Sequence, residues 1–311
     1  MTGQGRLRQD TCAMQAEKFL PSSLAWICRQ QLITGEMTAY RAMHGGASCW
    51  PAPLFSVLVR DLLACADPHA IRFSRRLYEA LPPRDRRSLT SAIVTLRWRL
   101  RGYVASQQGT DGLWRLHGRD GDSPVDVVTT ALATAMLFED RGAAFARTRV
   151  LAEELKSRTA GNILSDAAIL YLLAVAGKDA QKTGEALLAL RNVDGIQRLT
   201  SCWLLARAWG EALSYDAVAW RERMVADVLD TVQTMGDGGT MANAMALVAL
   251  LQLQYRGKEL DLLMRLLLDK TDPPWNWGHE PLHSDISSPS FVLSLVVSAL
   301  AQMLDLGRPA C

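Results

Sequence analysis

A tryptophan turn that leads into an apolar helix dominates this sequence. Residues 107–138 read QQGTDGLWRLHGRDGDSPVDVVTTALATAMLF, so Asp-Gly-Leu-Trp is followed by a polar loop and then by an almost wholly apolar run. Residues 272–304 repeat this plan, and both copies place Ser-Pro at the start of the apolar run. Such units bury their apolar faces only against one another. We therefore expect an internal repeat that forms one domain.

Weaker copies of the same pattern lie at 45–64, 161–177, 194–210 and 237–253. Together the copies give six apolar runs, which begin near positions 53, 124, 165, 199, 241 and 289. The gaps of roughly 35–70 residues between successive starts suit one helical hairpin per repeat. The sequence therefore predicts six helical hairpins, or about twelve helices.

The composition is that of a globular protein, which we treat as one domain over residues 1–311 with 1–20 as a candidate flexible N-terminal arm. Hydrophobic residues make up 49% of the chain, enough for a large core. The net charge of +2 gives no general reason to expect a nucleic-acid partner. No secretory signal and no apolar run long enough to span a bilayer is found. We expect a cytoplasmic protein that makes at most peripheral membrane contact.

The cysteines point to the same compartment. The chain has six of them, at positions 12, 28, 49, 65, 202 and 311, and no pair has CxxC spacing. Most lie in apolar stretches, where a free thiol packs as a small hydrophobic group. This usage is typical of a reducing environment.

Arginine is concentrated in residues 60–101, a segment without lysine. Its arginines are Arg60, Arg72, Arg75, Arg76, Arg84, Arg86, Arg87, Arg97, Arg99 and Arg101. Solvated helix faces around the Pro82-Pro83 turn are one interpretation of this run. A second is an anion site, for example for a diphosphate, because guanidinium groups bind such oxyanions through paired hydrogen bonds. A third is an RNA-binding face.

Helical periodicity is widespread, whereas strand signals are almost absent. Residues 225–234 and 259–268 space their apolar side chains by three and four, as amphipathic helices do. Other segments are apolar nearly all round, namely Val125–Phe138, Ala167–Ala176, Met241–Gln252 and Phe291–Leu304. A helix that is apolar on every side is buried on every side. The two kinds of helix predict a double ring, with the buried helices inside and the amphipathic ones outside.

The segment Gln107–Leu137 resembles the Gln-Trp repeat and the adjoining acidic motif of squalene–hopene-type terpene cyclases. The residues that carry the resemblance are Gln108, Gly112, Leu113 and Trp114. It is closest over this segment and extends over the rest of the chain only as repeat architecture. It implies an all-α protein that forms a single (α/α)6 toroid with an apolar central cavity, the fold shared with protein prenyltransferases. It also implies that the tryptophan ring stacks on the glutamine.

The acidic motif of those cyclases is Asp-x-Asp-Asp-Thr-Ala at the start of an inner helix, and its middle aspartate protonates an alkene or epoxide. The corresponding residues here, 126–131, read DVVTTA. Val128 stands at the proton-donating position, and Thr129 replaces the next carboxylate. Asp126 is the one carboxylate left in the string. The resemblance therefore implies acid-initiated chemistry with Asp126 as the leading donor.

Two carboxylates stand at the starts of apolar segments. Asp126 opens one segment, and Asp166 has the same register in another. A carboxylate in this position either caps the helix or faces the cavity as a general acid. Burial favours the protonated form and makes proton donation feasible. Asp126 is the first candidate acid and Asp166 is the reserve.

The polar loops of the two main copies supply the other candidates. Residues 275–285 contain two histidines four apart, but Pro281 argues against a helix that would place both on one face. No coherent set of ligands is legible, so we predict no metal. We expect the two loops to meet at one rim of the ring and to line a ligand mouth. The catalytic candidate in these loops is His279, and the substrate-binding candidates are Trp114, His117, Thr129, Thr130, Trp275, Trp277 and His283.

The sequence thus favours an enzyme that cyclises or isomerises a hydrophobic, isoprenoid-derived small molecule through a cationic intermediate. This activity follows from the resemblance, and a fold does not fix a reaction. A non-catalytic binding or scaffold protein that has lost the acid is a second hypothesis, which Val128 and Thr129 favour. A toroid recruited to other biosynthetic chemistry is a third. We expect no cofactor, and the expected partner is the hydrophobic ligand, with no nucleic acid.

Overall fold

The computed structural model describes residues 3–41, 53–66, 81–119, 124–137, 151–155, 157, 162–175, 195–211, 217–236, 238–269 and 286–306. Over these residues the protein is built from α-helices, with one short 3-10 helix, η2 (Leu63–Ala66), and one pair of two-residue strands. The predicted all-α class is confirmed.

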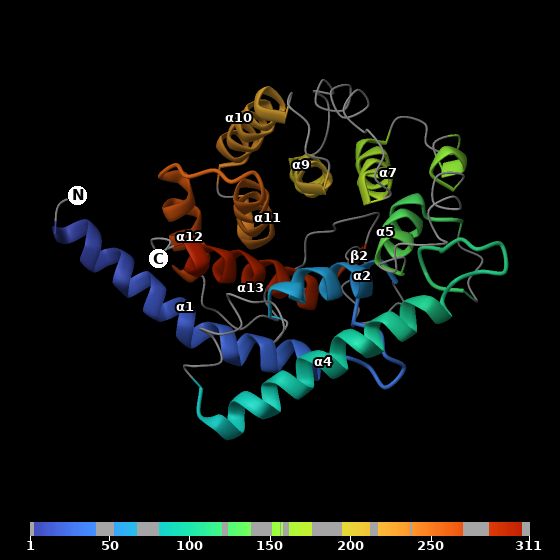
Figure 1. Ribbon diagram of the computed structural model, residues 1–311, viewed down its shortest axis with the longest axis horizontal. Coiled ribbons are helices and arrows are strands. Elements are labelled where there is room, and N and C mark those ends of the chain that lie inside the picture. The colour runs from blue at the N-terminus through green and yellow to red at the C-terminus, as the bar shows by residue number, and fades with distance from the viewer. Residues whose placement is uncertain are drawn as a thin grey trace.

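Six of the helices contact one another in a closed order (Figure 1). They are α2 (Pro53–Leu62), α5 (Val127–Leu137), α7 (Ile163–Val175), α9 (Gly195–Glu211), α11 (Gly239–Gln252) and α13 (Pro289–Leu306). Each packs on the next in this sequence, and α13 packs on α2. We call them the inner helices, because the other helices lie outside them in Figure 1.

Four of the inner helices, α5, α7, α11 and α13, are the segments whose sequence is apolar nearly all round. In α11 every residue from Met241 to Leu251 is buried, and in α5 every residue from Val128 to Met136 is buried. A side chain on any face of such a helix meets another helix, so the apolar surface leaves water on all sides. The predicted burial of these apolar segments is confirmed.

The outer helices are amphipathic. They are α1 (Gly3–Arg29), α4 (Pro83–Ser106), α10 (Ala217–Met235) and α12 (Glu259–Asp269). Helix α4 packs on α2 and α5, α10 on α9 and α11, and α12 on α11 and α13. On α4, Leu89, Ile93, Leu96 and Leu100 are buried at spacings of three and four, which puts them on one face.

Helix α1 takes in most of residues 1–20, the candidate arm. Its Ala16 and Leu20 are fully buried, and it packs on α13 and α4. After α1 the chain forms strand β1 (Tyr40–Arg41), which pairs antiparallel with β2 (Ile286–Ser287). This pairing joins segments far apart in the sequence next to the start of α13.

Two hydroxyl groups hold the starts of α2 and α13 against the segment that precedes β1. The Ser288 hydroxyl donates to the carbonyl of Thr38 over 2.7 Å, and the Met37 N–H donates to the Ser56 hydroxyl over 3.2 Å. Because both contacts involve residues 37–38, the N-terminal ends of α2 and α13 lie at the same side of the fold. Among the described helices, none is both long and apolar enough to cross a membrane.

Candidate functional site

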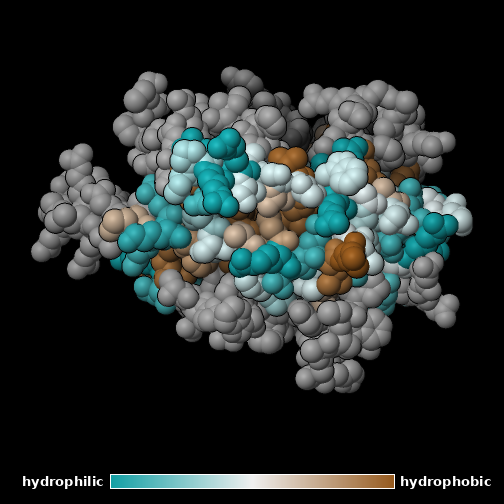
Figure 2. All heavy atoms as spheres, turned by 90° about the horizontal axis from the view of Figure 1, so that it is seen from below, coloured by the Kyte–Doolittle hydropathy of each residue, from teal (hydrophilic) through white to brown (hydrophobic). Residues whose placement is uncertain are grey.

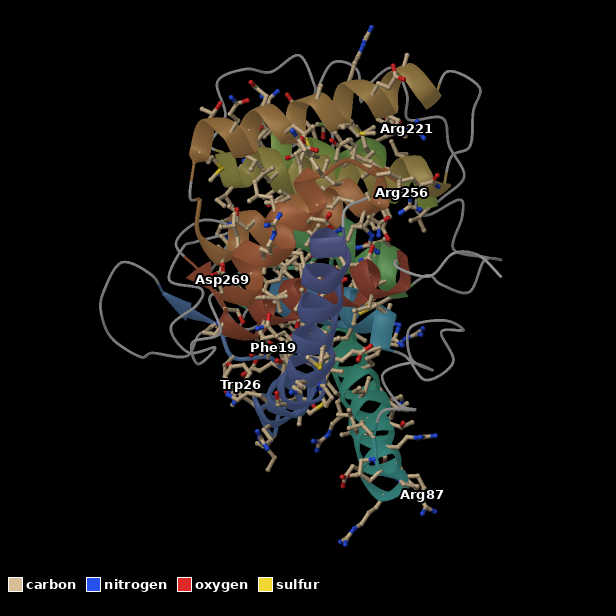
Figure 3. The ribbon with its side chains drawn as sticks, turned by 90° about the vertical axis from the view of Figure 1, so that its left-hand side faces the viewer. Phe19, Trp26, Arg87, Arg221, Arg256 and Asp269 are labelled. Carbon is tan, nitrogen blue, oxygen red and sulfur yellow. The ribbon has the colours of Figure 1, made fainter. Side chains whose placement is uncertain are left out.

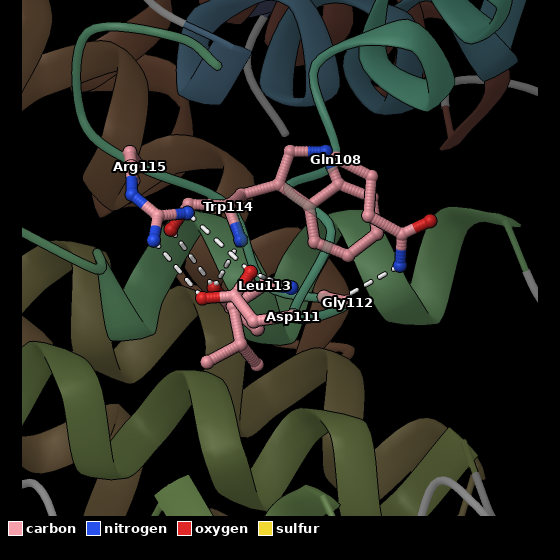
Figure 4. A network of polar contacts seen from close by, with 7 residues as sticks. Gln108, Asp111, Gly112, Leu113, Trp114 and Arg115 are labelled. Atoms are coloured by element: carbon pink, nitrogen blue, oxygen red, sulfur yellow. Dashed lines mark hydrogen bonds and ion pairs between the residues drawn. The ribbon is translucent and has the colours of Figure 1, made fainter. Parts of the chain in front are cut away.

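The tryptophan turn, residues 107–119, is held by hydrogen bonds between side chains and backbone (Figure 4). The buried Trp114 ring donates from Nε1 to the carbonyl of Val104 on α4 over 2.7 Å. The Gln108 amide donates to the carbonyl of Gly112 over 2.8 Å, and Gly112 adopts φ of 80°, which favours glycine. The glutamine therefore closes a part of the turn, and the tryptophan ring fastens the turn to α4.

The same turn is bound to the start of α5. The backbone N–H of Trp114 donates to the Thr130 hydroxyl over 3.0 Å, and that hydroxyl in turn donates to the carbonyl of Trp114 over 3.2 Å. The N–H of Asp126 donates to the carbonyl of Trp114 over 2.9 Å. The Thr130 side chain, a candidate substrate-binding group, thus holds the turn and the helix together.

Asp126 is the residue before the first turn of α5. Its Oδ2 accepts the backbone N–H of Thr129 over 2.8 Å and also the Thr129 hydroxyl. This is the geometry of a helix N-cap, which supplies an acceptor to a backbone N–H that the helix leaves unpaired. The sequence left two interpretations open for Asp126, a helix cap or a general acid. In the structure Asp126 has the geometry of a cap, and the Thr129 side chain takes part in the same contact.

Asp166 lies in the first turn of α7, where it is half-buried. The cap of this helix is Asn162, whose side-chain oxygen accepts the N–H groups of Leu164 and Ser165. His117 is half-buried in the tryptophan turn. The remaining candidates, His279, His283, Trp275 and Trp277, lie outside the described residues.

Within the tryptophan turn, Asp111 and Arg115 form a partly exposed ion pair over 3.0 Å (Figure 4). The hydrogen bonds from Arg115 hold the pKa of the Asp111 carboxyl below its usual range. An ion pair of this kind contributes little to stability, because water and salt screen it.

A group of charged and aromatic side chains joins three of the inner helices. Arg207 on α9 donates from Nη1 to Asp61 Oδ2 on α2 over 3.0 Å, and from Nη2 to the Tyr171 hydroxyl on α7 over 2.8 Å. Its guanidinium carbon lies 4.6 Å from the centre of the Tyr171 ring and 5.4 Å from that of Trp203. The planar cation is therefore fixed by a carboxylate, a hydroxyl and two aromatic faces.

A second arginine adjoins this group. Arg60 Nη1 lies 3.7 Å from Asp61 Oδ1, and the side chains of Arg60, Asp61 and Arg207 are 7%, 12% and 20% exposed. Charges this far from water interact more strongly than surface charges do. We call Arg60, Asp61, Tyr171, Trp203 and Arg207 the Arg207 cluster.

The Arg207 cluster lies toward the C-terminal ends of the helices that supply it. Asp61 is the second-last residue of α2, and Arg207 is in the last turns of α9. In the closed order of inner helices α2 and α9 are not neighbours, so the ion pair links two helices that stand apart in that order. The cluster is polar and partly accessible to solvent, and it lies among helices whose buried side chains are mostly apolar.

Three of the candidates chosen from the sequence, Asp126, Thr129 and Thr130, lie at the start of α5, whereas the Arg207 cluster lies toward the C-terminal ends of its helices. The cluster was not predicted, apart from Arg60 in the arginine-rich segment. A signal for it was present, however. Asp61 and Arg207 are charged residues within apolar runs, where an ionic group requires a partner.

A further buried ion pair lies between α9 and α10. Arg198 donates from Nε to Asp227 Oδ2 over 2.9 Å, and the Cys202 thiol lies 3.4 Å from the same oxygen. Burial, reinforced by the Asp227 charge, raises the pKa of the Cys202 thiol well above its usual value. Because this pair joins an inner helix to an outer one, it holds the two layers together.

Metal binding has no support from the residues whose positions are described. No group of three or more histidine, cysteine, aspartate or glutamate side chains among them is arranged to hold an ion.

No protein family model matches the sequence, and no curated protein matches it either.

Proposed function

We propose that the chain is a single (α/α)6 toroid, with the inner helices as its inner ring. The support is the closed order of contacts from α2 through α13 and back to α2, together with the amphipathic helices packed outside it. The tryptophan turn adds support, because it fastens the start of an inner helix to outer helix α4.

We propose that this ring binds a hydrophobic, isoprenoid-derived small molecule, whose polar end meets the Arg207 cluster. The observation that carries the proposal is the fixed guanidinium of Arg207, which joins inner helices α2, α7 and α9. Binding sites for small molecules combine apolar walls with a few polar groups held in place. Because a carboxylate, a hydroxyl and two aromatic rings already hold Arg207, contact with a ligand would cost the side chain little further freedom.

The catalytic form of this proposal is cyclisation or isomerisation through a cation, with Asp126 as the acid. The cap geometry of Asp126 favours the second candidate function, a binding protein without acid chemistry, since its Oδ2 already accepts two hydrogen bonds from Thr129. The two candidates differ in whether a bound ligand is converted.

Mass spectrometry under native conditions tests the binding proposal. The purified protein is incubated with farnesol, geranylgeraniol and the corresponding diphosphates, and bound ligand is measured for the wild type, Arg207→Met and Arg115→Met. We expect the wild type and Arg115→Met to retain ligand and Arg207→Met to lose at least tenfold in affinity, the usual effect of removing a charged hydrogen bond. Equal affinity of all three proteins, or no binding at all, would contradict the proposal.

The same incubations separate an enzyme from a binding protein. Extraction and mass analysis of the ligand detect a product with a new ring or a shifted double bond. If the wild type converts the ligand and Asp126→Asn does not, the protein is the acid-initiated enzyme. Binding without conversion identifies the non-catalytic alternative.

A further inference from the structure

Helix α4 carries an unusual concentration of positive charge. Its 24 residues include six arginines and a single acidic residue, Asp85. The arginines are Arg84, Arg86, Arg87, Arg97, Arg99 and Arg101. Three of them, Arg84, Arg87 and Arg99, are exposed. The end of the helix that bears Arg87 projects from the rest of the molecule (Figure 3).

Exposed apolar side chains lie among these arginines. Trp98 is 75% exposed, and Val94, one turn earlier on the same helix, is also exposed. A large aromatic ring in this situation gains nothing from the core of the isolated protein. Its exposure is therefore a property of the surface that needs an explanation.

The turn after α1 contacts α4 and carries a third exposed apolar side chain. Ile33 at the tip of the turn is 93% exposed. The turn is attached to α4, because the Gln31 amide donates to the carbonyl of Leu96 over 3.4 Å. Gly35 fits closely against the same stretch, where a Cβ would lie 3.2 Å from the carbonyl oxygen of Arg99.

We define the α4 face as Ile33, Arg84, Arg87, Val94, Trp98 and Arg99. Figure 2 looks onto the side of the molecule formed by α1 and α4 and shows hydrophobic atoms set among hydrophilic ones. We propose that the α4 face docks on a bilayer that contains anionic lipid, with Trp98, Ile33 and Val94 entering the headgroup region and the arginines contacting lipid phosphates.

The combination of side chains favours a bilayer over other anionic partners. Tryptophan is enriched at membrane interfaces, where its ring is apolar and its N–H reaches water, and arginine combines an apolar stem with a charged end. A nucleic acid would also attract the arginines, but the aliphatic side chains of Ile33 and Val94 offer it neither hydrogen bonds nor stacking. An anionic leaflet uses both kinds of residue at once.

Cosedimentation with vesicles tests the proposal on the full chain. Binding is measured on phosphatidylcholine vesicles and on mixed phosphatidylcholine–phosphatidylglycerol vesicles, at low and at high salt. We expect binding to the mixed vesicles only, weakened by salt because the charge interaction is screened. The variants Arg99→Gln and Arg87→Gln should each lower the partition coefficient about fivefold, the usual effect of one basic residue near an anionic surface.

Matched variants elsewhere on the surface control for non-specific effects. Trp98→Ala should reduce binding at least as strongly as an arginine variant, while Leu262→Ala, which removes an exposed apolar side chain from α12, should bind as the wild type does. Arg223→Gln removes an exposed arginine from α10, which lies across the molecule from α4 in Figure 1, and should also leave binding unchanged.

Three results would overturn the proposal. One is equal sedimentation with neutral and anionic vesicles, and another is equal loss of binding in the α4 variants and in their controls. The third is preferential binding of a single-stranded RNA oligonucleotide that vesicles do not displace. Circular dichroism spectra and melting temperatures of all variants establish that each one is folded, so that a loss of binding reports on the surface itself.

Discussion

Arg207 and Asp61 are 146 positions apart in the chain, yet they form a hydrogen-bonded ion pair of 3.0 Å between two inner helices that are not neighbours in the closed order of contacts. Each inner helix contacts the helices beside it in this order, and such contacts do not fix the distance between α2 and α9. The pair supplies such a restraint. Tyr171 extends it to α7, because it accepts a second hydrogen bond from the same guanidinium.

The first prediction concerns the energy of this pair. Arg207→Met and Asp61→Asn should each lower the free energy of unfolding by about 1–3 kcal/mol, because the first leaves the largely buried Asp61 with Arg60 as its remaining cation in the Arg207 cluster and the second removes the carboxylate that both arginines contact. The double variant should lose less than the sum of the two single losses, since it removes both members of the pair together. Urea unfolding followed by circular dichroism measures all four proteins of this cycle.

The exposed pair of Asp111 and Arg115 is the control for that cycle. Arg115→Met should change the free energy of unfolding by at most about 0.5 kcal/mol, because the pair is screened by water. Strict additivity of the Arg207 and Asp61 variants would mean that the two side chains do not interact energetically.

The second prediction separates the cap from the acid at Asp126. Asp126→Ala should lower the free energy of unfolding by about 1 kcal/mol, the usual effect of losing an N-cap, whereas Asp126→Asn should leave it nearly unchanged, because asparagine caps equally well. Chemical unfolding of both variants gives the comparison. Equal stability of the alanine variant and the wild type would show that the hydrogen bonds from Thr129 do not stabilise α5.

The third prediction compares a buried and an exposed tryptophan. The Trp114 side chain is 1% exposed and binds Val104, so Trp114→Ala should cost about 3–5 kcal/mol through the cavity that it leaves and the lost hydrogen bond. Trp98→Ala should alter stability by about 0.5 kcal/mol or less, because that ring lies in solvent. Thermal unfolding of the two variants is the measurement, and similar melting temperatures would contradict the assigned burial.

The inner helices could be predicted from the sequence because one property determines them. The predicted segments Met241–Gln252 and Phe291–Leu304 lie within α11 and α13, and Val125–Phe138 overlaps α5 closely. A helix without a polar face is stable only where other parts of the protein surround it, so local composition suffices to predict that it is buried. The pairing of β1 with β2 was not predicted, because strands of two residues carry no periodic pattern.

The candidate site was harder to predict, for two physical reasons. Whether Asp126 caps a helix or faces the interior depends on where α5 begins, and the start at Val127 differs by a few residues from the Pro124 start that Ser-Pro suggests. The Arg207 cluster depends on contacts between distant segments, and no local spacing encodes them. Only the presence of Asp61 and Arg207 in apolar runs indicated that partners were needed.

The last prediction concerns alkaline pH. Burial raises the pKa of the Cys28 thiol from its usual value near 9 to about 11, even though the nearby Arg29 charge acts in the opposite direction. In the unfolded chain the thiol ionises as the pH passes 9, while the folded protein keeps its proton until about pH 11. The stabilisation is therefore complete below pH 9 and is lost as the pH rises through this window, by at most about 1.4 kcal/mol per pH unit. Cys28→Ala removes the group, so its free energy of unfolding should fall less steeply between pH 9 and pH 11 than that of the wild type. Urea unfolding under reducing conditions at several pH values provides both slopes, and parallel slopes would show that Cys28 ionises equally easily in the folded and unfolded states.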